Sequence, residues 1–128
     1  MVNEYYTSEE IQEKITIRPM IHDRAKKIVS YALIYVPKPI AEKVLSDSIF
    51  IILDPPEKAF YLSKEVIGGR HVFIFSSIIY CENEYNKKYD VLHEVAHFHL
   101  KHVPSKGQRK EEWEDEVDLL ARDWIEAK

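Results

Sequence analysis

The stretch from Glu84 to His102 constrains the fold most, because its pattern predicts one helix with apolar side chains in nearly every direction. These apolar residues are Tyr89, Val91, Leu92, Val95, Ala96, Phe98 and Leu100. A helix that is apolar around most of its circumference has to be buried against other elements. We therefore expect the rest of the chain to pack around this segment.

The remaining segments alternate between helical and extended patterns. Capping residues and i, i+3, i+4 spacing of apolar side chains predict helices at 7 to about 15, 21–35, 40–45 and 110–127. Runs of β-branched and aromatic residues predict strands at Ser48–Leu53, Ala59–Leu62 and Arg70–Phe75, with Ile78–Tyr80 extending or following the last. The expected fold class is α+β, with a small few-stranded sheet packed on helices, in a single domain over residues 1–128.

Composition narrows the class of protein. The net charge of −4 gives no global basic surface, so nucleic-acid binding is not expected, and Lys26-Lys27 and Lys87-Lys88 are interpreted as solvated faces. One cysteine, Cys81, cannot form an internal disulfide and fits a reducing compartment. The polar first residues are not typical of a signal peptide, and the apolar runs are too short for a membrane span. These features predict a cytoplasmic protein.

The central helix contains the sequence His93-Glu94-Val95-Ala96-His97. Residues four apart are separated by only about 40° around a helix, so both imidazoles can reach one metal ion. Glu94 can lie beside that ion without binding it, where a carboxylate can take a proton from an activated water. This is the HExxH arrangement of zinc hydrolases, and it predicts Zn²⁺ as cofactor and Glu94 as general base.

A catalytic zinc site needs a third protein ligand. His99 and His102 point well away from the face that carries His93 and His97, so neither is expected to bind the metal. The acidic last helix offers carboxylates instead. Its apolar face comprises Trp113, Val117, Leu120, Ala121, Trp124 and Ile125.

Two acids lie at the rim of this apolar face. Glu114 is predicted as the third metal ligand, and Asp118, one turn further along, as the acceptor that orients a ligand histidine. Most other acids of the helix, Glu116 among them, are expected to face solvent.

Two segments together resemble the gluzincin zinc metallopeptidases, in the style of the short intracellular ImmA/IrrE-like members. They are Val91 to Phe98, around the HExxH sequence, and Glu114 to Ala121. The resemblance implies a zincin-like fold, a peptide or protein substrate beside a sheet edge, and a transcriptional regulator as a partner. Val117 stands where the family commonly has alanine, which leaves Glu116 as the alternative ligand.

Three functions remain open on this basis. The first is a zinc-dependent peptidase in which Glu94 passes the proton to the leaving amine. The second is a non-catalytic zinc-binding regulatory or interaction module, although such a module would not need Glu94. The third is a helical scaffold without metal. His71 and several tyrosines are candidates for stabilising charge during the reaction, and either Ala59–Leu62 or Arg70–Phe75 is expected to form the sheet edge.

Overall fold

The computed structural model describes residues 4–15, 17–18, 23–53, 59–62, 71–101 and 110–127. Within these ranges the chain is mostly helical and contains one small sheet, so the predicted α+β class is confirmed in a broad sense. The helices are α1 (Ser8–Lys14), α2 (Asp23–Leu33), α3 (Lys38–Asp47), α5 (Glu84–His99) and α6 (Lys110–Ala127), with a 3-10 helix η1 (Ser77–Cys81). The strands are β1 (Ile17–Arg18), β2 (Ser48–Leu53), β3 (Ala59–Leu62) and β4 (His71–Ser76).

The strands form one sheet in the order β1-β2-β4-β3 within the described part of the chain. The β1–β2 and β2–β4 pairs are parallel, whereas β3 runs antiparallel to β4. Phe50 on β2 and Phe73 on β4 are register partners, and their buried rings stack with centroids 4.9 Å apart. Because β4 is internal, β3 is the sheet edge on this side, which decides between the two edge strands expected from the sequence.

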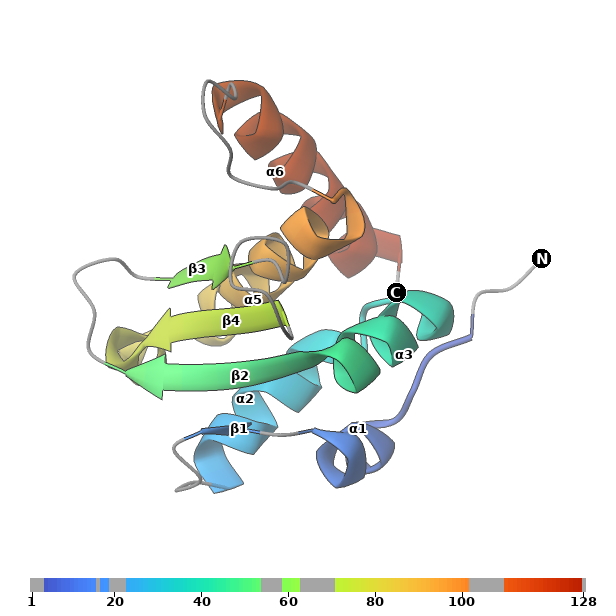
Figure 1. The fold of residues 1–128 in the computed structure, drawn as a ribbon, viewed down its shortest axis with the longest axis vertical. Helices are drawn as coiled ribbons and strands as arrows, with labels where there is room; N and C mark the ends of the chain where they lie inside the picture. Colours follow the sequence, from blue (N-terminus) through green and yellow to red (C-terminus); the bar gives the residue numbers. More distant parts are fainter. Residues whose placement is uncertain are drawn as a thin grey trace.

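The helices pack in layers on this sheet. Figure 1 shows α2 and α5 side by side behind the strands, with α6 lying on α5 away from the sheet. Phe98 of α5 contacts the sheet through the rings of His71 and Phe73, with centroids 4.7 and 6.0 Å apart respectively. The helix that carries the HExxH sequence is therefore held between the sheet, α2 and α6, as its apolar circumference predicts.

Several boundaries differ from the sequence predictions. The helix expected over 21–35 is described from Asp23 and ends at Leu33, and α3 is longer than the expected Ile40–Leu45 because it begins before Pro39. Proline is tolerated in the first turn, where its missing N–H would have no helical partner. The expected strand at Ile78–Tyr80 is wrong, since these residues lie in η1. The expected start of β4, Arg70, lies outside the described residues.

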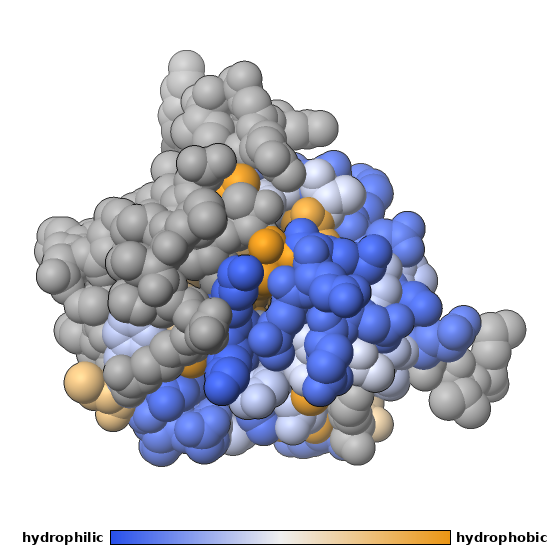
Figure 2. Space-filling view, turned by 90° about the horizontal axis from the view of Figure 1, so that it is seen from below, coloured by the Kyte–Doolittle hydropathy of each residue, from blue (hydrophilic) through white to orange (hydrophobic). Residues whose placement is uncertain are grey.

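The helix starts follow capping chemistry. The Thr7 side chain accepts from the Glu10 backbone N–H and the Glu10 carboxylate accepts from the Thr7 N–H, which confirms the predicted cap. Hydrophilic residues dominate the described part of the face in Figure 2, where hydrophobic atoms show in small areas. None of the helices in the described ranges combines the length and apolarity that crossing a membrane requires.

Candidate metal centre

Helix α5 places both histidines of the HExxH sequence on one side. The Asn83 side chain caps the helix by accepting from the Asn86 backbone N–H at 2.8 Å. Five residues around its middle are buried, namely Val91, Leu92, Glu94, Val95 and Ala96. This burial fixes the rotation of α5, and the imidazole rings of His93 and His97 then lie against each other with centroids 5.1 Å apart.

Helix α6 brings a carboxylate to these rings. Its buried residues Val117, Ala121 and Trp124 belong to the same core as α5, which turns Glu114 toward the two histidines. The Glu114 carboxylate lies 2.8 Å from His93 Nε2 through one oxygen and 3.2 Å from His97 Nε2 through the other. Ligand atoms of the three residues all lie within 4.8 Å of one another.

The group is enclosed on the histidine side and open on the carboxylate side. The side chains of His93 and His97 are 19% and 12% exposed, whereas that of Glu114 is 52% exposed. A ligand or solvent molecule can therefore approach past Glu114, while the histidines are held by the protein.

The Glu94 carboxyl lies beside this group and is buried. Its Oε2 is 4.0 Å from His93 Nε2, and 7% of the residue is exposed. Burial, and then the nearby charges of Glu114 and Asp90, together raise the pKa of Glu94 to about 8. Glu94 is thus close enough to act on a molecule held by the group without belonging to it.

Asp118 lies next to Tyr89 and Arg122. Its carboxylate accepts a short hydrogen bond from the Tyr89 hydroxyl and is paired with Arg122 at 3.1 Å. The Tyr89 hydroxyl in turn lies 3.4 Å from His93 Nδ1. Asp118 was predicted as the acceptor that orients a ligand histidine, and in the structure the Tyr89 hydroxyl contacts both Asp118 and His93.

Tyr89 takes part in the site through its hydroxyl group, which the sequence analysis did not predict. It was counted only as part of the apolar circumference of the helix. Its position four residues before His93 is the signal that could have found it, since side chains at this spacing are neighbours on a helix. The pKa of Asp118 is lowered, first by its hydrogen bond with Tyr89 and then by the Arg122 charge. The pKa of Tyr89 is raised, first by burial and then by the same hydrogen bond with Asp118.

The other candidate residues in the described ranges are not part of this group. Glu116 is exposed and is not part of the group, and His99 is exposed with its ring 6.1 Å from that of Trp124. His71 is buried, and its ring lies against that of Phe98. His102 lies outside the described residues.

The residues present fit a divalent metal ion. Two imidazole nitrogens and a carboxylate are a donor set that zinc accepts, with bonds of about 2.0–2.2 Å that keep tetrahedral ligand atoms roughly 3.3 Å apart. The measured contacts of 2.8 and 3.2 Å are slightly shorter than this. A small outward movement of the half-exposed Glu114 side chain would therefore open the space, so the group is consistent with an H-x-x-x-H…E metal site.

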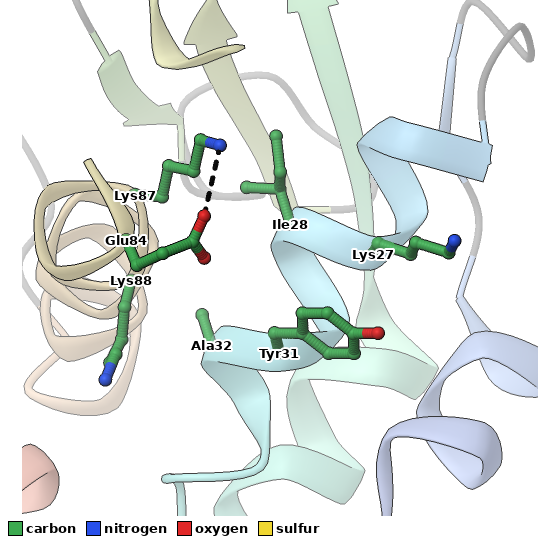
Figure 3. A pocket seen from close by; sticks show the side chains of 7 residues that line it. All are labelled: Lys27, Ile28, Tyr31, Ala32, Glu84, Lys87 and Lys88. Carbon is green, nitrogen blue, oxygen red and sulfur yellow. Dashed lines mark hydrogen bonds and ion pairs between the residues drawn. The ribbon is translucent and has the colours of Figure 1, made fainter. Parts of the chain in front are cut away.

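A cavity of about 160 Å³ lies on the other side of α5, between this helix and α2. Figure 3 shows Glu84 and Lys87 of α5 facing Ile28 and Ala32 of α2 across it, with the Lys88 ammonium group pointing away. Glu84 and Lys88 lie about 160° around the helix from the middle of the His93–His97 face. This cavity is therefore separate from the candidate metal centre.

Comparison of the chain with protein-family models, with curated proteins and with solved structures gave no match. The resemblance to gluzincin metallopeptidases therefore depends on the sequence motifs and on the geometry of His93, His97 and Glu114. The fold and the site together define a small, mostly helical α+β protein with a candidate metal-binding group.

Proposed function

We propose that this protein is a zinc-dependent peptidase of the gluzincin type, with a zincin-like fold. The observation that carries the proposal is the convergence of His93, His97 and Glu114, with the buried Glu94 carboxyl 4.0 Å from His93. A site that served only for metal storage or folding would not need an additional carboxyl group in this place.

His93, His97 and Glu114 would hold the ion. Zinc, when bound, supplies Lewis acidity toward a carbonyl oxygen and lowers the pKa of water. The chain's own contribution to the chemistry is Glu94, which takes a proton from the attacking water and delivers it to the leaving amine. Glu94 is placed for this role by its position beside the ligand group, with its carboxyl 4.0 Å from His93 Nε2.

The free edge of β3 is the proposed binding site for an extended peptide. This strand is paired on one side only among the described residues, and it packs against α5. An exposed strand edge can take up a peptide by main-chain pairing, which would place the scissile bond alongside the helix. A transcriptional regulator as the partner, and a cytoplasmic location, remain predictions from the sequence.

The substitution Glu94→Gln tests the proposed chemistry. Glutamine keeps the shape of the side chain but cannot accept the proton, so we expect zinc content to stay unchanged and hydrolysis to fall about 10²- to 10⁴-fold. The measurement is cleavage of unfolded casein and of a mixed peptide library by the zinc-loaded wild type and variant, with zinc content determined in parallel.

The same experiment separates the alternative function. Hydrolysis at the wild-type rate by the Glu94→Gln variant would contradict the role of Glu94. A wild-type protein that binds zinc and cleaves none of the probes would favour the non-catalytic zinc-binding module.

A further inference from the structure

We infer that Tyr89 is a positioning residue. Through the Tyr89 hydroxyl group, Asp118 fixes the orientation of the His93 imidazole and the proton on its Nδ1. This inference rests on the proposed metal site, and it concerns how one of its ligands is held. The Tyr89 hydroxyl donates to Asp118, and its oxygen lies 3.4 Å from His93 Nδ1. The rings of Tyr89 and His93 are 5.6 Å apart.

The direction of these hydrogen bonds follows from the chemistry of Asp118. Its ionised carboxylate accepts from Arg122 Nε at 3.2 Å and can only accept, so the proton between Asp118 and Tyr89 belongs to the tyrosine. The lone pairs of the Tyr89 oxygen are then available to a donor. The donor that faces them is His93 Nδ1–H, so the chain of hydrogen bonds runs from His93 through Tyr89 to Asp118.

A proton held on Nδ1 by Tyr89 leaves Nε2 as the nitrogen of His93 that would bind a metal ion. Without metal, the same nitrogen donates to the Glu114 carboxylate at 2.8 Å, and a bound ion would take the place of that proton. Partners of this kind set the tautomer and orientation of a ligand imidazole and raise its basicity. Tyr89 contacts the far side of the ring and not the space between the ligands, so it acts through His93 and not on a substrate.

The arrangement ties the two helices of the site together at a second point. Tyr89 and His93 are on α5, whereas Asp118 and Arg122 are on α6, about one and two turns beyond Glu114. The rotation of α6 that brings Glu114 to the histidines also brings Asp118 to Tyr89. The packing of α6 on α5 therefore positions Glu114 as one ligand and also positions Asp118, which supports His93 as another.

The test is a set of zinc affinities measured by competition with a chromophoric chelator. Tyr89→Phe keeps the ring but removes the hydroxyl, and we expect it to lower zinc affinity about 10- to 100-fold, with a loss of the same size expected for Asp118→Asn. The double variant should differ from the weaker single variant by no more than about twofold, because both changes interrupt one chain. Tyr85→Phe, one turn earlier and stacked on Tyr89, is the matched control and should bind as the wild type does.

A spectroscopic measurement distinguishes positioning from a general loss of structure. In the zinc-loaded wild type, the His93 Nδ1 proton should give a slowly exchanging resonance in NMR spectra, and this protection should be lost in Tyr89→Phe but not in Tyr85→Phe. Zinc binding by Tyr89→Phe within about twofold of the wild type, or additive losses in the double variant, would overturn the inference while leaving the metal site intact. A wild type that binds no zinc would overturn both.

Discussion

The environment of Glu94 departs clearly from that of an ordinary carboxyl group. It is buried beside two other acids, and its neighbours in the HExxH sequence are held by the packing of α5. A carboxyl group whose pKa is raised holds a proton in the folded state over a pH range in which the unfolded chain has already lost it. This difference couples the stability of the metal-free protein to pH.

We predict that the metal-free protein becomes less stable as pH rises from about 4.5 to about 8 because of Glu94. Unfolding in this window releases the proton, so this group lowers the free energy of unfolding by at most about 1.4 kcal/mol per pH unit. Denaturant unfolding in the presence of a chelator checks this, with Glu94→Gln as the comparison. The stability of the wild type should fall relative to the variant with rising pH, and parallel curves for the two proteins would contradict the prediction.

At the scale of elements, the end of α5 contains an unfavourable backbone conformation. Lys101 follows the C-cap residue Leu100 and has φ of 59°, while its N–H donates to the Phe98 carbonyl at 3.2 Å. This left-handed conformation is common after helix ends, where glycine adopts it without a steric penalty from Cβ. The chain thus accepts a small strain directly after the helix that carries the candidate ligands.

Replacing Lys101 with glycine should stabilise the protein by up to about 1 kcal/mol, since it removes this penalty. The matched control is Lys43→Gly, at an exposed position within α3, which should destabilise by about 0.5–1 kcal/mol. Thermal unfolding of both variants gives the comparison. A loss of stability in Lys101→Gly as large as that in Lys43→Gly would show that the left-handed conformation carries no cost.

The elements show which parts of the structure a local pattern can predict. The apolar spacing of α6 predicts which face of the helix packs inward. This spacing alone predicts that Glu114, and not Glu116, lies near the histidines. The two-residue strand β1 has no periodicity to detect, and the β-branched run at Ile78–Tyr80 satisfies strand propensity although the chain turns there into η1. The partner of Tyr89 lies on another helix, so its hydrogen bond to Asp118 depends on tertiary packing that no local pattern contains.

At the scale of the whole molecule, the candidate site is formed by packing between two helices that follow each other in the chain, α5 and α6. Helix α5 is fixed by the sheet and α2, whereas the main contacts of α6 are with α5 (Figure 1). The two histidines therefore come from the centre of the fold, and the carboxylate comes from an outer layer. A metal ion bound to all three would join that outer helix to the core.

The zinc content of the purified protein tests the central claim most directly. Elemental analysis after dialysis against zinc and then metal-free buffer should give about one zinc per chain in the wild type and in Glu116→Ala. It should give little or none in His93→Ala, His97→Ala and Glu114→Ala, because each removes a ligand. Zinc retained at the wild-type level in a His93→Ala/His97→Ala double variant, or absent from the wild type, would contradict the account.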